Sequence, residues 1–215
     1  ITLRHPTDKI HHELINEISI PLINAGDGCN QHPSQAFIDI FSILQYKSNI
    51  QDLSIAIVGD SIHSRVAHSL IDILTVLDAK EIRLIGPKSL TSNHPASIIS
   101  RHESLIEGLD NADVVITLRI NKERFEHNQD IPNTMEYHTK YGLTQQALTH
   151  ANPNAIILHP GPVNRGIEIE SALISCPQSI IHQQVCNGIP IRMALINHCL
   201  SKINRYPDTS VITID

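Results

Sequence analysis

The stretch that decides the fold is residues 53–77, which read LSIAIVGDSIHSRVAHSLIDILTVL. Its first part, residues 53–59, is an apolar run that ends in glycine, which predicts a buried β-strand. The second part carries apolar residues at helical spacing, which predicts a helix with one buried face. These apolar residues are Val66, Leu70, Ile73, Leu74 and Leu77. A buried strand that leads through a polar loop into a helix is the repeating unit of α/β proteins with parallel sheets.

The same unit recurs on both sides of this stretch, so the whole chain is predicted to be α/β, with helices on both faces of its sheets. Further strands are expected at residues 1–4, 21–24, 81–86, 113–118 and 155–158, with 179–182 as a candidate last strand. Helices are expected at residues 33–46 and 104–109. A final helix is predicted because five apolar residues fall on one helical face. These residues are Ile189, Met193, Ile196, Leu200 and Ile203.

Local signals refine the first helix and its end. Pro33 suits the first helical position, and Gln35 lies three residues after His32, where the glutamine of a capping box is found. The apolar pattern breaks at Lys47-Ser48-Asn49, which is the candidate boundary between two lobes.

Composition and charge exclude several functional classes. Hydrophobic residues make up 41% of the 215 residues and charged residues 18%, as in a globular protein. The 16 basic and 22 acidic side chains give a net charge of −6 without any basic block, so neither nucleic acid nor a membrane is an expected partner. No apolar stretch is long enough for a transmembrane helix. The four cysteines show no C-x-x-C spacing and no signal peptide is present, which predicts reduced thiols and a cytoplasmic protein.

Polar residues gather where the predicted strands end. Five such clusters are Arg4-His5-Pro6, residues 24–35, residues 59–65, Arg119 and residues 159–162. Ligands of open parallel sheets bind beyond the carboxyl ends of the strands. Arginine is the preferred bidentate partner of carboxylate and phosphate groups. Since three clusters carry an arginine in an acidic protein, the pattern indicates a small ligand with several negative charges.

Each arginine also has a purely structural interpretation. Arg65 lies in the first turn of a predicted helix, where the helix dipole disfavours a cation, so it either serves a ligand or is solvated or paired with Asp60. Arg119 ends an apolar strand and could instead pair with a local carboxylate such as Glu123. Arg4 lies near the first residue of the chain and is ambiguous by itself.

His32 precedes Pro33 at a predicted helix N-terminus, after a glycine-rich turn. Backbone N–H groups bind anions there, and a histidine beside them can donate to a developing oxyanion. The alternative is a histidine that only caps the helix. The pair His11-His12 is expected to face solvent. Neither H-E-x-x-H nor a Cys/His cluster at zinc spacing occurs, so no metal is expected.

Taken together, the motifs resemble the catalytic chain of bacterial aspartate carbamoyltransferases. The matching segments follow one another in order from Ile1 to about Ile203. They are LRHP at 3–6, NAGDGCNQHPSQ at 24–35, VGD at 58–60, HSRV at 63–66, LRI at 118–120, KER at 122–124 and HPGPVNRG at 159–166. The sister ornithine enzymes have a His-Cys-Leu-Pro signature where this chain has His159-Pro160-Gly161-Pro162, which favours the aspartate branch.

The resemblance implies two α/β lobes, each a parallel sheet flanked by helices. Residues 1–47 would be the C-terminal part of a carbamoyl-phosphate-binding lobe, and residues 48–184 would be an aspartate-binding lobe. Residues 185–215 would be a final helix that returns to the first lobe, followed by a tail. The implied reaction transfers the carbamoyl group of carbamoyl phosphate to L-aspartate, a step of pyrimidine biosynthesis that needs no cofactor or metal.

The resemblance also implies roles for individual residues. Arg4, His32 and Gln35 would hold carbamoyl phosphate and act as the catalytic residues, with help from the backbone of Gly161 and Pro162. In these roles Arg4 would neutralise the phosphate, His32 would donate to the carbonyl oxygen, and Gln35 would hold the carbamoyl amide. Arg65 and Arg119 would bind the two carboxylates of aspartate.

The chain departs from the family pattern at several points. The family's Ser-Thr-Arg-Thr phosphate loop and mobile lysine loop are absent and are expected upstream of Ile1. The 215-residue chain is therefore expected to be inactive alone and to bind a bisubstrate analogue such as N-(phosphonacetyl)-L-aspartate weakly. Asn121 stands where many relatives have glutamine, which could alter the aspartate pocket.

The family also forms homotrimers with active sites shared between chains, and dihydroorotase or a regulatory chain could join them. A non-catalytic relative that serves as an assembly or regulatory partner stays open as an alternative. A dinucleotide-binding oxidoreductase is a third class, but the glycine fingerprint G-x-G-x-x-G is missing from the sequence.

Overall fold

The computed structural model describes residues 1–120 and 133–203, and these residues contain two parallel sheets. The smaller sheet pairs β1 (Thr2–His5) with β2 (Ile23–Asp27). The larger sheet has the strand order β5-β4-β3-β6-β7. Its strands are β3 (Ser54–Val58), β4 (Glu81–Ile85), β5 (Ile99–His102), β6 (Val114–Thr117) and β7 (Ile156–Leu158). The predicted α/β fold with parallel sheets is therefore confirmed.

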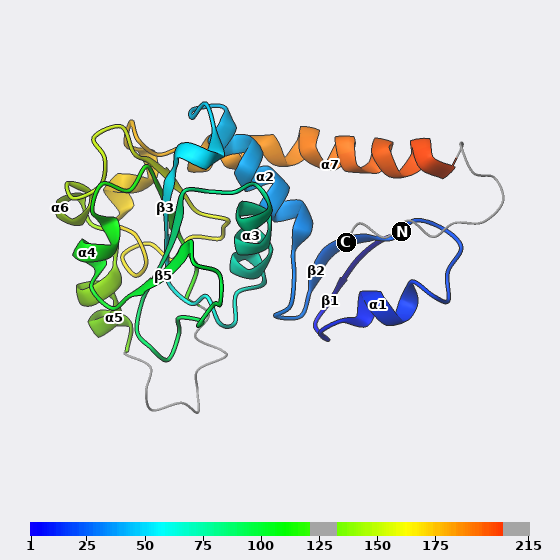
Figure 1. The fold of residues 1–215 in the computed structure, drawn as a ribbon, viewed down its shortest axis with the longest axis horizontal. Helices are drawn as coiled ribbons and strands as arrows, with labels where there is room; N and C mark the ends of the chain where they lie inside the picture. Colours follow the sequence, from blue (N-terminus) through cyan, green and yellow to red (C-terminus); the bar gives the residue numbers. More distant parts are fainter. Residues whose placement is uncertain (121–132, 204–215) are drawn as a thin grey trace.

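Helices cover both faces of the five-stranded sheet (Figure 1). Side chains of β3 alternate between the two faces, as the period of a strand requires. Ile55 and Ile57 join a core cluster with α2 (Pro33–Leu44) and α3 (Arg65–Val76). Ala56 and Val58 join the cluster on the other face, with α4 (Leu105–Leu109), α5 (Thr134–Tyr141) and α6 (Gln145–Leu148). All five residues of β3 are buried, which explains why its sequence is an apolar run.

The long helix α7 (Ile181–Ile203) packs against α2 and extends toward the small sheet and α1 (Ile10–Leu14) (Figure 1). Polar side chains join α7 to α2: Asn187 Nδ2 donates to Ser42 Oγ at 2.9 Å and to Gln45 Oε1 at 2.8 Å. Two short 3₁₀ helices, η1 (Ile50–Asp52) and η3 (Ser171–Ser175), complete the described elements. The helix pair α2–α7 thus connects the two sheets.

Three sequence predictions about the fold are wrong. Residues 179–182 do not form a strand, because Ser179 makes a single bridge with Ile157 and α7 begins at Ile181. The pair His11-His12 does not face solvent as a whole: His12 is exposed, but His11 is buried. The Nε2 atom of His11 lies 3.1 Å from Leu3 O, and its Nδ1 atom lies 3.5 Å from Asp27 Oδ1, so His11 ties β1 to the end of β2.

The third error concerns Gln35. It is not part of a capping box, because its Nε2 donates to Asp39 Oδ1 at 2.8 Å on the next turn of α2. His32 is the N-cap residue of α2, but its side chain makes no capping hydrogen bond.

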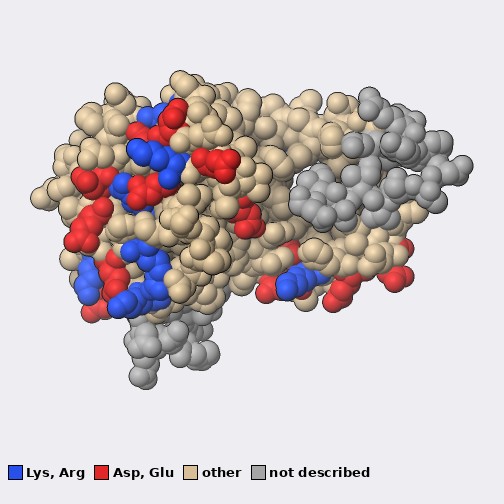
Figure 2. Space-filling model, in the orientation of Figure 1, with Lys and Arg blue, Asp and Glu red and all other residues tan. Residues whose placement is uncertain are grey.

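Four of the apolar residues predicted on one face of the last helix are exposed. Ile189, Met193, Ile196 and Leu200 are between 46% and 68% exposed on α7. On the face drawn in Figure 2, Lys, Arg, Asp and Glu side chains are interspersed over the five-stranded sheet, while α7 is largely uncharged.

No disulfide joins the four cysteines, which all lie in the described part of the chain. Among the described helices, none combines the length and the apolar character that crossing a membrane requires.

Candidate active site

The topology of the larger sheet creates one preferred place for a ligand. From β3 the chain moves outward through β4 to β5, and it then returns to the other side of β3 as β6 and β7. The strand order therefore reverses between β3 and β6, and ligands bind beyond the carboxyl ends of strands at such a switch point. Arg65 follows the end of β3, and Arg119 follows the end of β6. The two arginines therefore flank the switch point.

Arg65 reaches from the larger sheet to the loop after β2. Its Nη1 donates to Gly28 O at 3.2 Å. A Cβ atom built on Gly26 would lie 2.8 Å from Arg65 Cζ, and Gly26 has a φ of +126°, which L side chains rarely adopt. The residue at position 26 is therefore glycine for two reasons, its backbone conformation and the guanidinium packed against it.

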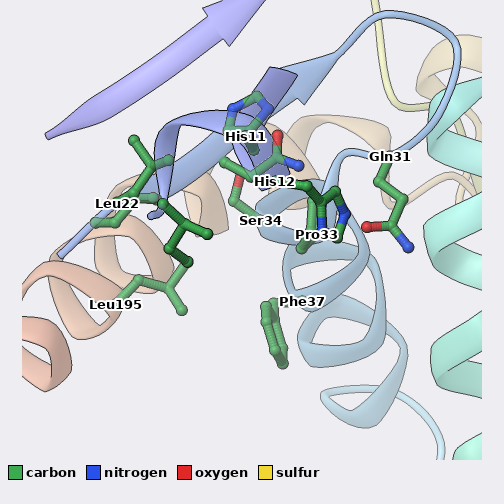
Figure 3. Close-up of a pocket in the computed structure, with 11 residues that line it drawn as sticks. His11, His12, Leu22, Gln31, Pro33, Ser34, Phe37 and Leu195 are labelled. Carbon is green, nitrogen blue, oxygen red and sulfur yellow. The ribbon is translucent and has the colours of Figure 1, made fainter. Parts of the chain in front are cut away.

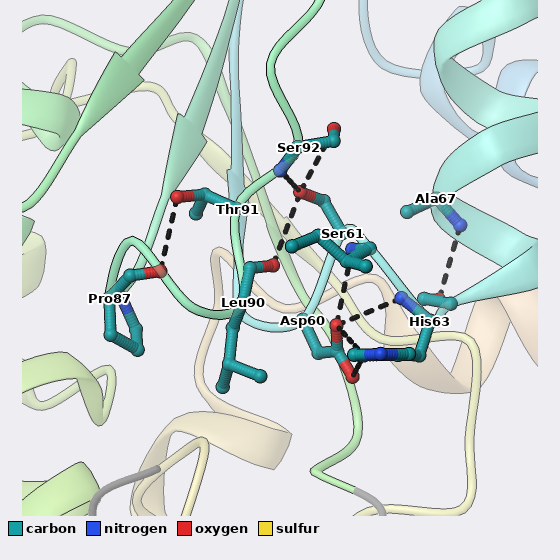
Figure 4. A network of polar contacts seen from close by, with 10 residues as sticks. Asp60, Ser61, His63, Ala67, Pro87, Leu90, Thr91 and Ser92 are labelled. Atoms are coloured by element: carbon teal, nitrogen blue, oxygen red, sulfur yellow. Dashed lines mark hydrogen bonds and ion pairs between the residues drawn. The ribbon is translucent and has the colours of Figure 1, made fainter. Parts of the chain in front are cut away.

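The loop before Arg65 is held by its own hydrogen bonds (Figure 4). Asp60 Oδ1 accepts from the backbone N–H groups of Ile62 at 3.1 Å and His63 at 3.0 Å. Ser64 caps α3, because its Oγ accepts from Ala67 N at 3.2 Å. These contacts fix the backbone position of Arg65, which is the first residue of α3.

His32 is a neutral imidazole surrounded by cations. Burial, followed by the positive charges of Arg65, Arg4 and Arg192, lowers its pKa from 6.5 to about 4. Its Nδ1 lies 3.3 Å from Ser34 Oγ, and its backbone N–H donates to Ser69 Oγ of α3 at 2.8 Å. At neutral pH a ring of this kind carries one N–H and can donate one hydrogen bond.

Arg65 reaches the loop that precedes His32 through its 3.2 Å hydrogen bond to Gly28 O, and the charges of Arg65 and Arg4 both lower the His32 pKa. Arg4 lies in β1, where the register with β2 is irregular: His5 pairs with Asp27, whereas Leu3 pairs with Asn24. Its side chain is exposed, so it is accessible to a ligand.

Sequence reasoning missed Arg192, which also acts on His32 from α7. Its guanidinium folds over Gly188, one turn earlier on the same helix. The sequence does contain an indication that Arg192 is unusual, because it is the only Asp, Glu, Lys or Arg between Glu170 and Lys202. A cation so far in sequence from any other charged residue needs an anionic partner or solvent, and Arg192 is exposed.

Arg119 is exposed, one residue beyond the buried Leu118. It is not among the charges that act on His32. Its alternative partner Glu123 and the nearby Asn121 lie outside the described residues, as does the KER segment at 122–124. The position of Arg119 at the end of β6 is thus the structural support for its predicted role.

The loop after β7 contains the predicted residues Gly161 and Pro162, which are both exposed. His159 anchors this loop: its Nδ1 accepts from Gly161 N at 2.9 Å, so its other ring nitrogen, Nε2, carries the proton. Nε2 then donates to Glu168 Oε1 at 3.1 Å. The same Glu168 oxygen accepts from Asn164 N, and Asn164 Nδ2 donates to Ile120 O at 3.1 Å. The loop is therefore tied to the residue after Arg119.

Gln35 belongs to a buried polar junction between α2 and α7. Asp39 Oδ1 accepts from Gln35 Nε2 at 2.8 Å and from Gln184 Nε2 at 2.7 Å. Gln184 Oε1 in turn accepts from His159 N at 3.0 Å. Sequence reasoning did not find Asp39 or Gln184, because the contact joins residues 145 positions apart.

The carboxyl group of Asp39 makes stability depend on pH. Burial raises its pKa from 3.8 to about 7, against the effect of the two amide hydrogen bonds. Between these two values the folded state keeps a proton that the unfolded state has lost, so the contribution of Asp39 to the free energy of unfolding falls as pH rises. The fall from about pH 4 to about pH 7 is on the order of 4 kcal/mol.

We therefore expect Asp39→Asn to gain stability relative to wild type as pH rises. Urea unfolding of both proteins at about pH 5 and about pH 8 measures this, and groups common to both cancel in the difference. A difference between the two proteins that is equal at both pH values would contradict the raised pKa.

A separate cavity of about 300 Å³ lies between α1, α2 and α7 (Figure 3). His11, Pro33, Phe37 and Leu195 contribute to its wall, and none of the residues that line it is Lys or Arg. The cavity therefore does not match the polyanionic ligand that the arginines indicate. Among the described residues, no three His, Cys, Asp or Glu side chains are grouped so that they could hold a metal ion.

Two family models match the chain. The model for "Aspartate/ornithine carbamoyltransferase, carbamoyl-P binding domain" matches residues 1–45. The model for "Aspartate/ornithine carbamoyltransferase, Asp/Orn binding domain" matches residues 51–199, which is more than half of the chain. The chain therefore belongs to the aspartate/ornithine carbamoyltransferase family.

Similar proteins support the aspartate branch of this family. The aspartate carbamoyltransferase catalytic subunit of Ruthia magnifica subsp. Calyptogena magnifica is 47% identical over 202 residues, which cover 93% of this chain and 63% of that relative. The structure of aspartate transcarbamoylase from Trypanosoma cruzi in complex with N-(phosphonacetyl)-L-aspartic acid has a TM-score of 0.76 and 26% identity, over 91% of this chain and 62% of that one.

Ornithine carbamoyltransferase from Thermus thermophilus shares the fold, with a TM-score of 0.79 at 20% identity over 93% of this chain and 66% of that one. The resemblance to aspartate carbamoyltransferase catalytic chains is thus confirmed, and the chain spans about 63% of the length of the curated relative.

Proposed function

We propose that the protein transfers the carbamoyl group of carbamoyl phosphate to the amine of L-aspartate, giving N-carbamoyl-L-aspartate and phosphate. The observation that carries the proposal is the neutral His32 with Arg4, Arg65 and Arg192 around it at the N-terminus of α2. Such a site attracts anions and also supplies an uncharged hydrogen-bond donor. Carbamoyl phosphate and aspartate are both anionic, and their reaction develops charge on a carbonyl oxygen.

The reaction needs positioning and charge stabilisation rather than a covalent intermediate. The aspartate nitrogen attacks the carbonyl carbon, the bond from that carbon to the phosphate oxygen breaks, and phosphate leaves. His32 donates to the carbonyl oxygen as its negative charge grows, and Arg4 neutralises the phosphate. Arg65 and Arg119 bind the two carboxylates of aspartate from both sides of the switch point.

Residues 159–162 of the loop after β7 offer acceptors and not donors to a ligand. The N–H of Gly161 is already bound to His159 Nδ1, and Pro162 has no N–H. The carbonyl oxygens of Gly161 and Pro162 therefore remain, and they match the NH₂ group of carbamoyl phosphate. Gln35 Oε1 is a further acceptor for the same group, because its Nε2 is bound to Asp39.

The domain boundaries and the partners belong to the same proposal. Residues 1–47 contribute to the carbamoyl-phosphate-binding lobe, residues 48–184 form the aspartate-binding lobe, and residues 185–215 are a final helix that returns to the first lobe, followed by a tail. We propose a cytoplasmic homotrimer with shared active sites, which dihydroorotase or a regulatory chain could join. The two family matches, with a gap between residues 45 and 51, support a lobe boundary near Lys47.

The test is product formation by the protein expressed from its complete gene. We expect carbamoyl phosphate and L-aspartate to give carbamoyl aspartate and phosphate in equal amounts, and L-ornithine to give no ureido product. Chromatography of the amino acid products and a phosphate assay measure both. A folded protein that forms neither product would favour the alternative of a non-catalytic assembly partner, and citrulline from ornithine would place the protein in the sister branch.

A further inference from the structure

We propose that Asp39 is a positioning residue that holds Gln35 and the 159–162 loop as paired acceptors for the NH₂ group of carbamoyl phosphate. The proposal rests on the proposed function and adds a residue that determines specificity for the carbamoyl group. Asp39 itself is 0% exposed and does not touch the substrate. It acts through the two amide side chains that it binds.

The central observation is that one carboxyl oxygen serves two helices. Asp39 Oδ1 accepts from Gln35 on α2 and from Gln184 on α7, at 2.8 and 2.7 Å. The other oxygen, Oδ2, is buried and has no hydrogen-bond partner within the described residues. The side chains of Gln35, Asp39 and Gln184 are all buried, so solvent water does not compete for these hydrogen bonds. A buried network of this kind holds its members in one arrangement.

The contact with Asp39 determines which atoms of the Gln35 amide can bind a ligand. Nε2 carries the two N–H donors of the glutamine side chain, and one of them is bound to Asp39, which fixes the orientation of the amide. Oε1 is therefore the end that remains, and no hydrogen bond described for the chain uses it. An amide oxygen only accepts hydrogen bonds. Gln35 Oε1 can thus accept from an NH₂ group, and it forms no hydrogen bond with a methyl group.

Gln184 carries the same constraint to the loop after β7. With its Nε2 on Asp39, its Oε1 accepts from His159 N at 3.0 Å. His159 in turn engages the N–H of Gly161, which leaves the loop with carbonyl oxygens for a ligand. Both sets of acceptors are therefore positioned relative to one atom, Asp39 Oδ1.

Acetyl phosphate tests this proposal, because it has a methyl group in place of the NH₂ group and keeps the phosphate. The quantity to measure is the inhibition constant of acetyl phosphate divided by the KM of carbamoyl phosphate, in protein expressed from the complete gene. We expect Asp39→Leu, which removes the acceptor, to lower this ratio about tenfold or more. Binding of the phosphate by Arg4 is common to both compounds and cancels.

The conservative variant and the control define the outcomes. Asp39→Asn keeps an acceptor oxygen for both amides and should retain the wild-type ratio. Ser42→Ala is the control, because Ser42 is buried on the next turn of α2 and accepts from Asn187 of α7 at 2.9 Å without contacting Gln35. It should also leave the ratio unchanged. An unchanged ratio in Asp39→Leu, or an equal fall in Ser42→Ala, overturns the proposal.

A second variant keeps the test decisive if Asp39→Leu does not fold. Gln184→Leu leaves the bond between Asp39 and Gln35 in place and releases the loop, so we expect a smaller fall in the same ratio. No fall in this variant also overturns the proposal. A folded wild-type protein without carbamoyl transfer would instead reject the proposed function itself, and the wild-type assay reports this before any variant is compared.

Discussion

Replacing His32 with alanine is expected to lower kcat by about 100- to 1,000-fold, because one donor to the developing oxyanion is lost. The melting temperature should fall by only a few degrees. A helix cap contributes about 1 kcal/mol, and the His32 ring makes no capping hydrogen bond to α2. Steady-state kinetics and thermal unfolding of the protein expressed from its complete gene measure the two effects separately.

A cap of known geometry serves as the control for His32. Ser104 caps α4, since its Oγ accepts from Glu107 N at 3.3 Å. We expect Ser104→Ala to lower the melting temperature and leave kcat unchanged. If His32→Ala keeps near-normal turnover and melts much earlier, His32 is a structural residue and the catalytic assignment is wrong.

The pKa of His32 gives the same prediction a second readout. Because its folded pKa of about 4 lies below the usual 6.5, the ring stays neutral from pH 8 down to about 5. The kcat of the wild type should therefore show no loss from His32 protonation until the pH approaches 4.

Replacing Arg65 or Arg119 with alanine is expected to cost about 3 kcal/mol of transition-state stabilisation, a loss of more than about 100-fold in kcat/KM for aspartate. Each change removes charge-assisted hydrogen bonds to one carboxylate. The KM for carbamoyl phosphate should change far less. Lysine should not restore the loss, because it lacks the planar fork of arginine.

Arg101→Ala is the matched control, since Arg101 is exposed on the edge strand β5, away from the switch point. It should leave all kinetic constants unchanged. An aspartate KM that stays at the wild-type value in both Arg65→Ala and Arg119→Ala would reject the assignment of these two residues.

The sequence predicted the elements whose buried faces can be recognised from the pattern of their apolar residues. β3 is covered by helices on both faces, and its apolar run predicted a strand. β5 was missed because it is an edge strand with no buried residue, and its sequence ISRH has no apolar alternation. α1 was missed because it has only five residues, too few for a helical period to repeat.

The residues of the candidate site also fall into two groups: those that the sequence predicted and those that were found only in the structure. Position at strand ends marked Arg65 and His32 as candidates, but they follow strands of different sheets, so the reach of Arg65 to the loop after β2 was found only in the structure. The contact of Asp39 with Gln184 and the effect of the Arg192 charge on the His32 pKa depend on how α7 packs against α2. Packing between helices so distant in sequence leaves no local pattern, so these residues were found only in the structure.

The most direct test of the site is a crystal structure of the protein, expressed from its complete gene, with N-(phosphonacetyl)-L-aspartate bound. We predict that the phosphonate contacts Arg4, that the amide carbonyl lies within hydrogen-bond distance of His32, and that the two carboxylates contact Arg65 and Arg119. An analogue bound with its carboxylates away from both Arg65 and Arg119, or away from the N-terminus of α2, would contradict the account.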